Sequence, residues 1–112
     1  MSHRDWQLRV QDMIDAAKEI QTFVQGMDFE TFKDDIKTIR SVELNFIVIG
    51  EAAALIPQDI QVAHSNIPWH LIRGMRNRLV HAYFEVDPML VWDTIQNDLE
   101  PLNSALEDLI QK

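Results

Sequence analysis

The chain has 112 residues, which suffices for one domain with a real core but leaves much apolar surface exposed. Its 46% hydrophobic content, with only three glycines and four prolines, favours a compact helical protein over a turn-rich sheet or a disordered chain. The formal charge of −8 argues against broad, sequence-blind binding to nucleic acid, and the lack of cysteine excludes disulfides and thiolate metal sites. Any contact with RNA should therefore be local.

The start of the chain lacks the apolar run of a signal peptide. No apolar stretch approaches the roughly 20 residues that are needed to span a bilayer. We therefore expect a cytoplasmic protein with no membrane partner. No repeat, low-complexity tract or domain boundary occurs, so residues 1–112 are expected to form a single domain.

The first predicted helix opens at Ser2, which together with Asp5 resembles a capping box. Gly26 is expected to end this helix, because a left-handed backbone costs glycine no Cβ strain. Asp28 can then cap a short turn over residues 29–32. The apolar positions of the helix recur at spacings of three and four residues; they are Trp6, Val10, Met13, Ala17, Ile20 and Val24.

A second long helix is predicted from about Ile36 to Ile56, before Pro57. One apolar stripe on it consists of Ile39, Val42, Phe46, Ile49, Ala53 and Ile56. A second set lies largely off that stripe and consists of Leu44, Ile47, Val48 and Leu55. Because the helix is apolar on more than one side, it should be buried twice, and the second burial is expected to be a subunit interface.

Residues 57–67 are interpreted as a polar connector, after which Pro68 suits the first turn of a third helix. The inner face of the third helix is predicted to contain Trp69, Ile72, Met75 and Leu79. Asp87 and Pro88 then start a last helix, which Pro101 must bend or break. Its inward positions are Val91, Ile95, Leu99, Leu102, Leu106 and Leu109. The expected fold is all-α, an antiparallel up-and-down bundle of four to five helices that forms a homodimer.

The stretch from Arg73 to Phe84 contains three arginines, a histidine and a tyrosine. No Asp or Glu occurs between Asp59 and Glu85, so the local charge reverses sign in an otherwise acidic chain. Such a reversal is typical of a site for an anion. Arginine can bind phosphate oxygens in pairs, and histidine can take or give a proton near neutrality.

Arg76 and His81 are five residues apart, which separates them by about 140° on a continuous helix. The neighbours of His81 on such a helix would be Asn77 and Arg78. Convergence of Arg76 and His81 therefore needs one of two arrangements. The helix could end near Val80, or a second copy could bring its histidine to this arginine across a two-fold axis.

The pattern alone also allows a purely structural interpretation. In it, Arg76 and Arg78 are solvated, His81 is a satisfied histidine at a helix end, and Tyr83 is a core aromatic with its hydroxyl at the rim. Glu51 lies inside an apolar run and is either a partner for an arginine or a residue that orients the site. The four histidines show no metal-ligand spacing, so no metal or cofactor is expected.

Residues 76–83, Arg-Asn-Arg-Leu-Val-His-Ala-Tyr, resemble the Arg-x4-His-x-Tyr signature of HepT-like toxins of the HEPN superfamily. Residues 49–53, Ile-Gly-Glu-Ala-Ala, resemble the second-helix motif of that family, and residues 67–69, Ile-Pro-Trp, resemble its entry to the motif helix. Val86-Asp87 with Val91-Trp92 resemble its following turn and helix. These blocks come in the family's order across most of the chain, whereas the N-terminal helix matches only as an amphipathic pattern.

The resemblance implies an all-α homodimer in which two copies of the signature line one cleft. It further implies a metal-independent endoribonuclease, the toxin of a type II toxin–antitoxin system, with tRNA as one candidate substrate. His81 is then the general base or acid, and Arg76 is the clamp on the scissile phosphate. The supporting contacts would be Asn77, Arg78, Arg73 and Glu51.

Tyr83 corresponds, on the same resemblance, to a tyrosine that receives AMP from a minimal nucleotidyltransferase antitoxin. An adduct beside His81 would block the cleft and repel RNA phosphates. Two other functions stay open. The chain could be a non-catalytic, nucleotide-binding partner subunit of a nucleotidyltransferase, or a purely structural dimerisation domain.

Overall fold

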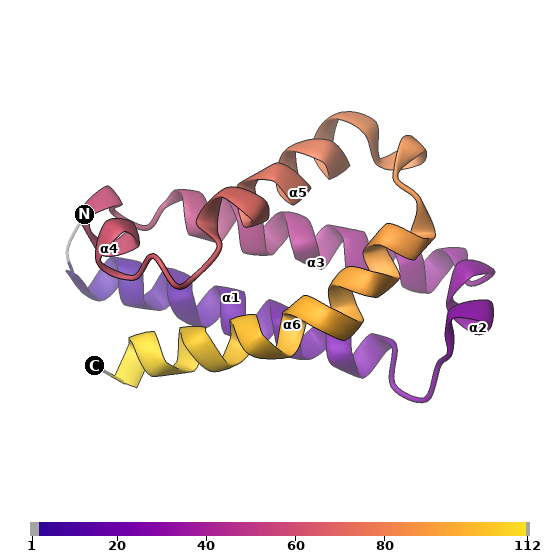
Figure 1. Cartoon of the computed structure of the whole chain (residues 1–112), viewed down its shortest axis with the longest axis horizontal. Helices are drawn as coiled ribbons and strands as arrows, with labels where there is room; N and C mark the ends of the chain where they lie inside the picture. Colours follow the sequence, from indigo (N-terminus) through magenta and orange to yellow (C-terminus); the bar gives the residue numbers. More distant parts are fainter. Residues whose placement is uncertain (1–2, 112) are drawn as a thin grey trace.

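The computed structural model describes residues 3–111, and side chains are described from Asp5 onward. All regular structure in this part of the chain is helical (Figure 1). The elements are α1 (His3–Phe23), α2 (Phe29–Lys33), α3 (Ile36–Ala54), α4 (Gln58–Ala63), α5 (Trp69–Ala82), the 3-10 turn η1 (Tyr83–Glu85) and α6 (Pro88–Gln111). The all-α prediction is confirmed, with more helices than the four to five expected. No helix in residues 3–111 combines the length and the apolar character needed to cross a lipid bilayer.

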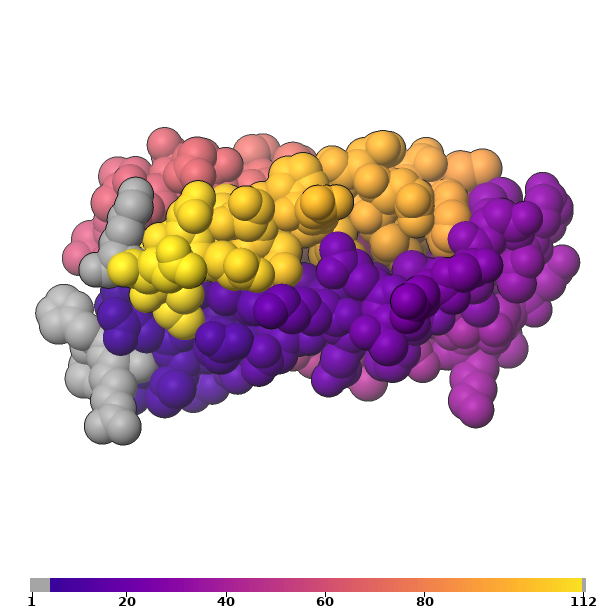
Figure 2. Space-filling model, turned by 90° about the horizontal axis from the view of Figure 1, so that it is seen from below, coloured from indigo at the N-terminus to yellow at the C-terminus, as the bar shows by residue number. Residues whose placement is uncertain are grey.

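The four long helices run back and forth along the longest axis of the molecule (Figure 1). α3 packs against α1 on one side and against α5 on the other, and α6 returns to pack against α1. From below, α1 and the second half of α6 lie side by side (Figure 2). α5 therefore packs chiefly on α3, which makes α3 the element that positions the signature.

The core confirms the predicted helical periodicity. Each of the six predicted stripe positions of α1 is buried, and so is each of the six on the second predicted helix. On α5 the buried residues are Trp69, Ile72 and Leu79, while Met75 is partly buried. On α6 all predicted inward positions are buried except Leu102, which is partly buried. These side chains fix the rotation of each helix and hence the direction in which its polar residues point.

The second apolar set of α3 is not covered within the chain. Leu44 is 59% exposed, Val48 and Leu55 are also exposed, and Ile47 is partly buried. The three exposed side chains recur at spacings that place them on one face of α3. We call them the α3 strip. Its burial in a subunit interface stays a prediction.

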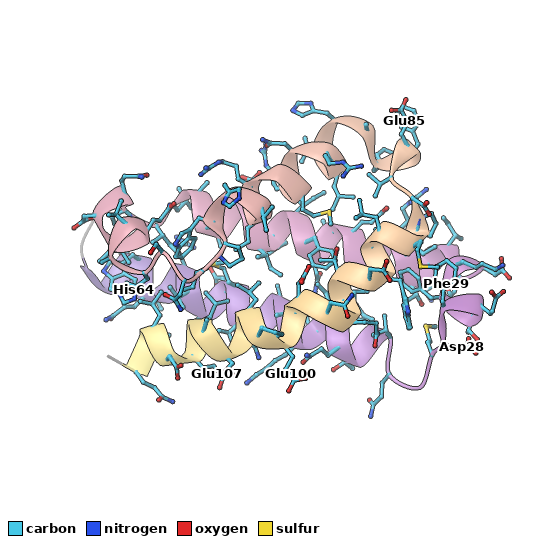
Figure 3. All side chains as sticks on the ribbon, viewed as in Figure 1. Asp28, Phe29, His64, Glu85, Glu100 and Glu107 are labelled. Atoms are coloured by element: carbon cyan, nitrogen blue, oxygen red, sulfur yellow. The ribbon has the colours of Figure 1, made fainter. Side chains whose placement is uncertain are left out.

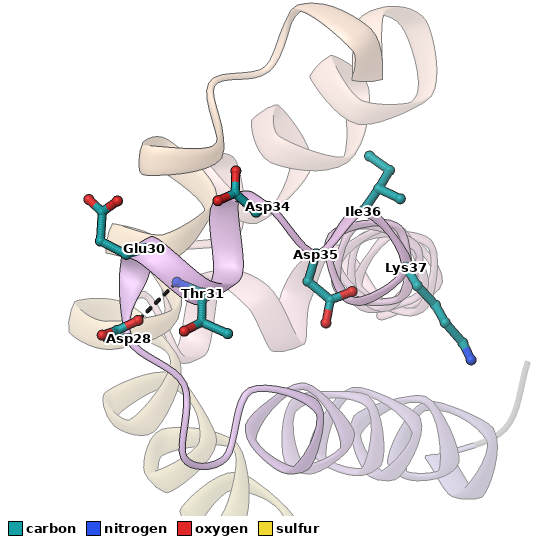
Figure 4. A pocket seen from close by; sticks show the side chains of 7 residues that line it. All are labelled: Asp28, Glu30, Thr31, Asp34, Asp35, Ile36 and Lys37. Atoms are coloured by element: carbon teal, nitrogen blue, oxygen red, sulfur yellow. Dashed lines mark hydrogen bonds between the residues drawn. The ribbon is translucent and has the colours of Figure 1, made fainter.

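Helix ends follow the predicted caps where these are described. Gly26 has φ +80°, as expected for its position after α1, whereas Ser2 of the predicted capping box lies outside the described residues. Asp28 accepts a hydrogen bond of 2.9 Å from the backbone N–H of Thr31 (Figure 4). Asp35 caps α3 in the same way by accepting from Thr38 at 3.0 Å. Both hydrogen bonds favour the charged carboxylate and hold the pKa of each aspartate below its usual value.

Two features differ from the prediction, and the alternatives for Pro101 are narrowed to one. The polar connector contains α4, and the side-chain amide of Gln61 in this helix donates to the backbone oxygens of Ala53 and Ile56 at 3.3 and 3.0 Å. α3 ends at Ala54, two residues before the expected end. Pro101 bends α6 but does not break it, since the helix runs through from Pro88 to Gln111 (Figure 1).

Candidate active site on α3 and α5

The signature residues occupy the last two turns of α5 and the first residue of η1. α5 continues through Ala82, so His81 still lies within the helix and the helix end does not bring it to Arg76. Arg76 and His81 therefore point about 140° apart within one chain. Of the two arrangements that would bring them together, only the second copy of the chain is left.

Arg76 is tied to α3 by an ion pair. Its Nε donates to Oε1 of Glu51 at 2.6 Å, and Nη2 is also within ion-pair distance of that oxygen. Nη1 donates to Oδ1 of the neighbouring Asn77 at 2.9 Å. Two of the five guanidinium N–H donors are thus hydrogen-bonded, and the side chain is still 31% exposed. The structure brings Glu51, Arg76 and Asn77 together and leaves donors of Arg76 available to an anion.

Gly50 permits this close approach of the two helices. A Cβ atom at Gly50 would lie 2.6 Å from Cγ of Arg76 and closer still to its Cβ. Only a residue without a side chain allows α5 to rest on α3 at this point. The sequence contains Gly50 in a recognisable block, but the need for a glycine there becomes apparent only when the opposing residue is known.

Arg78 and His81 lie on the other side of α5. Arg78 lines a groove of about 630 Å³ between α5 and α6, together with Leu71 and Gly74 of its own helix. His81 is exposed in the last turn and follows these residues at helical spacing, so it continues the same face beyond the groove. Within the described part of the chain, neither side chain has a hydrogen bond or an ion pair.

Arg73 is exposed one turn before Arg76, and its side chain also has no partner among the described residues. In residues 5–111, every other arginine is in an ion pair with a carboxylate. Arg73 and Arg78 are therefore the arginines of this region that keep their full charge available to a ligand. This agrees with the absence of acidic residues between Asp59 and Glu85.

Tyr83 is 49% exposed, so its interpretation as a core aromatic is wrong. The guanidinium carbon of Arg40 lies 4.9 Å from the centroid of its ring, and Phe84 meets it edge to face at 5.8 Å. Arg40 is also paired with the buried Glu43 at 2.8 Å. Sequence reasoning missed Arg40, because only the packing of α3 on α5 brings it next to Tyr83, which is 43 positions further along the chain.

The remaining histidines are dispersed. His64 lies at the left end of the molecule, far from Glu85, which follows the signature (Figure 3). The backbone oxygen of His64 accepts a hydrogen bond of 3.1 Å from the indole of Trp69, which gives this residue a place in the fold. His70 lies on the groove. Across the described residues, no three His, Cys, Asp or Glu side chains gather in a way that could hold a metal ion.

A second concavity surrounds α2 and is lined by Asp28, Glu30, Asp34 and Asp35 (Figure 4). Lys33 of the same helix is paired with Glu30 at 2.8 Å. This local excess of carboxylates would repel a phosphate. The anion site predicted from the sequence is therefore on α5 and not here.

Comparison with known proteins identifies the family of the chain. Residues 13–109 match the family model described as "Ribonuclease HepT-like". The chain is 37% identical over 108 residues to the "Probable ribonuclease HepT" of Thermococcus cleftensis, an alignment that covers 96% of each protein. It is 35% identical over 89 residues to a protein of Caldanaerobacter subterraneus, covering 80% of each, and 33% identical over 112 residues to one of Methanocaldococcus jannaschii, covering 99% of this chain and 96% of the relative.

The Caldanaerobacter and Methanocaldococcus proteins are each named "Putative RNase". No solved structure matches the chain significantly. The family model covers most of the chain and includes all of the residues that form the Glu51–Arg76 pair and the signature. The chain belongs to the HepT-like ribonuclease family of HEPN proteins.

Proposed function

We propose that this chain is a metal-independent endoribonuclease and the toxin of a type II toxin–antitoxin system, acting as a cytoplasmic homodimer. Membership of a ribonuclease family supports the reaction class. The observation that carries the proposal is the arrangement of α5. Arg76 is held in a fixed orientation by Glu51, while His81 is exposed and unpartnered on the same helix.

The reaction needs few protein groups because RNA supplies its own nucleophile. One imidazole removes the proton of the 2′-hydroxyl, and the oxygen formed attacks the adjacent phosphorus. The bond to the 5′-oxygen breaks, and that oxygen takes up a proton from an imidazolium. Arg76 donates its free N–H groups to the charge that develops on the phosphate oxygens. The imidazolium formed in the first step can donate that proton, so each of the two equivalent sites in a two-fold cleft needs one His81 and one Arg76.

The exposed apolar surface of α3 also favours a dimer. The α3 strip has Glu51 on its face, so an interface formed by the strip would border the Glu51–Arg76 pair. In such a dimer Arg76 of one subunit can face His81 of the other. The Glu51 carboxylate cancels the charge of Arg76. Arg73 and Arg78 would therefore supply the long-range attraction of RNA to the cleft.

Tyr83 is proposed as the point of control. Its ring is half exposed at the end of the signature helix, two residues after His81. Transfer of AMP to its hydroxyl by a minimal nucleotidyltransferase antitoxin would add bulk and a negative charge beside the proposed base. RNA would then be excluded by both volume and charge.

The reaction is tested with purified protein and RNA in excess EDTA. We expect cleavage to persist, and His81→Ala to abolish it, whereas the control His64→Ala should retain activity because His64 lies at the end of the molecule away from the signature (Figure 3). Loss of wild-type cleavage in EDTA with recovery on adding Mg²⁺ would contradict the assigned roles. A wild-type protein that binds nucleotides without cleaving RNA would instead support the non-catalytic partner subunit.

Control by AMP is tested by the intact mass of protein co-expressed with its nucleotidyltransferase. Wild-type protein should gain AMP units, and Tyr83→Phe should gain none while keeping its fold, since the substitution preserves nearly all of the packing volume. Tyr83→Phe should also stay toxic in the presence of the antitoxin. A Tyr83→Phe protein that is still modified and neutralised would exclude Tyr83 as the acceptor.

A further inference from the structure

Arg40 and Tyr83 form a contact that the proposed cleavage chemistry does not use. The guanidinium of Arg40 lies over the Tyr83 ring at 4.9 Å from carbon to centroid. Arg40 comes from the second turn of α3, and Tyr83 follows the last residue of α5. Both side chains are exposed to solvent. The place where α3 begins and α5 ends is therefore accessible to a ligand.

A buried carboxylate fixes the orientation of Arg40. Nη1 donates to Oε1 of Glu43 at 2.8 Å, and the Glu43 side chain is only 5% exposed. A carboxylate in such a position needs a partner, because burial without one is strongly unfavourable. Nε and Nη2 of Arg40 donate to no described residue. The guanidinium is thus anchored at one nitrogen and presents its other donors beside Tyr83, as a phosphate-binding arginine does.

Arg40 is too far from Arg76 for the two to share one phosphate. Seven residues separate Arg76 from Tyr83, which is about 10 Å along the helix axis. Arg76 is also bound to Glu51, eleven residues beyond Arg40 on α3. A ligand that contacted both arginines would have to offer two phosphates.

We propose that Arg40 binds a phosphate diester next to Tyr83, at a subsite separate from the Arg76 phosphate. This proposal rests on the function proposed above. The diester has two possible sources with the same chemistry. One is a phosphate of the RNA strand that flanks the scissile one. The other is the AMP group on Tyr83, which forms when the phenolic oxygen attacks the α-phosphorus of ATP, pyrophosphate leaves and the phenolic proton passes to solvent.

Two variants of Arg40 are designed to remove the phosphate contact without unfolding the protein. Arg40→Lys leaves a cation for Glu43 but removes the planar fork. The double variant Arg40→Ala with Glu43→Gln removes both charges together, so that no unpaired carboxylate stays buried. The control is Arg9→Ala, because Arg9 also pairs with a carboxylate at i, i+3, here the exposed Asp12 on α1. Circular dichroism should show that all three retain the helical fold.

The RNA source is tested by binding of a single-stranded RNA oligonucleotide in a His81→Ala background, where the strand is not cleaved. We expect both Arg40 variants to raise Kd roughly tenfold, as for the loss of one charge-assisted hydrogen-bonded contact. In the double variant the slope of log K against log salt should fall by about 0.7, the value for one phosphate contact on a single strand. Arg9→Ala should leave Kd and slope unchanged.

To test the AMP source, the rate at which the nucleotidyltransferase transfers AMP from ATP to Tyr83 is measured by intact mass. The protein used here retains His81. The Arg40 variants should be modified roughly tenfold more slowly than wild type if the diester on Tyr83 is the ligand. An effect in one measurement identifies the source, and effects in both indicate one subsite that serves both. Wild-type rates and affinities in both would overturn the proposal for Arg40 while leaving the nuclease intact. A wild-type protein that neither cleaves RNA nor accepts AMP would instead overturn the proposed function, and the Arg40 subsite with it.

Discussion

The two faces of α5 differ in how their polar side chains are held. On the face toward α3, Arg76 is bound by Glu51, and Tyr83 at the end of the helix lies under Arg40. On the opposite face, Arg78 borders an open groove, and neither it nor His81 has a partner within the described residues. One face is therefore preorganised by its neighbouring helix. The other depends on what binds to it.

Because of this difference, the two faces suit different roles in the proposed site. A side chain that is already oriented loses little entropy when substrate binds, so Arg76 suits a contact that must be accurate at the reacting phosphate. Its charge is neutralised by Glu51, which makes it a poor source of long-range attraction. Arg78 is free of carboxylates and suits the capture of RNA by an acidic protein.

Replacement of each arginine by alanine separates these roles and has the largest expected effect. Arg76→Ala should lower kcat by about 10² to 10³, as removal of a donor to a developing oxyanion does. Arg78→Ala should act mainly on KM and by about tenfold or less. The measurement is steady-state cleavage of a short RNA. Equal losses of kcat in both variants would show that the two faces do not differ in function.

Gly50 offers a test of the preorganised face. Gly50→Ala should destabilise the protein by about 1 to 3 kcal/mol, because the new Cβ overlaps the Arg76 side chain. The midpoint of thermal unfolding should fall, and kcat should fall with it as Arg76 is displaced. Gly74→Ala is the matched control, since a Cβ there meets nothing within 4 Å and alanine favours the helix. A Gly50→Ala protein as stable as the Gly74→Ala protein would contradict the close packing of α3 on α5.

The smallest expected effect concerns the start of α3, which sets the position of Arg40. The hydrogen bond from the Thr38 N–H lowers the pKa of Asp35 in the folded state. Its stabilising contribution is therefore complete above the unfolded value of 3.8 and is lost as the pH falls through the lower folded pKa. Asp35→Asn keeps a capping oxygen without a titrating group. Thermal unfolding between pH 7 and pH 2.5 should show a steeper acid loss of Tm for wild type than for Asp35→Asn, and parallel curves would refute the cap.

Much of the fold could be predicted from the sequence because its determinants are local. Apolar periodicity identified the buried faces of the four long helices, and Asp28 and Gly26 act within a few residues of their own positions. α4 was missed because its support comes from Gln61, which bonds back to the end of α3. A polar composition alone gives no sign of such a bond.

The candidate site could be predicted only in part. The signature identified Arg76, His81 and Tyr83 as a group, and Glu51 was recognised as a possible partner for an arginine. Two further facts depend on how α3 and α5 lie side by side. One is that Glu51 binds Arg76, and the other is that Arg40 lies over Tyr83. Contacts between helices over 25 or 43 residues of sequence leave no local pattern that would reveal them.

The central claim is that one subunit supplies Arg76 and the other supplies His81. It is tested most directly by mixing the variants Arg76→Ala and His81→Ala, each with little or no activity alone, and allowing subunits to exchange. If the site is shared, half of the dimers are mixed and each contains one intact site, so cleavage should recover to about a quarter of the wild-type rate. Mixing Arg76→Ala with the double variant of both residues should restore nothing. A mixture of the two single variants that exchanges subunits and stays inactive would contradict the shared site.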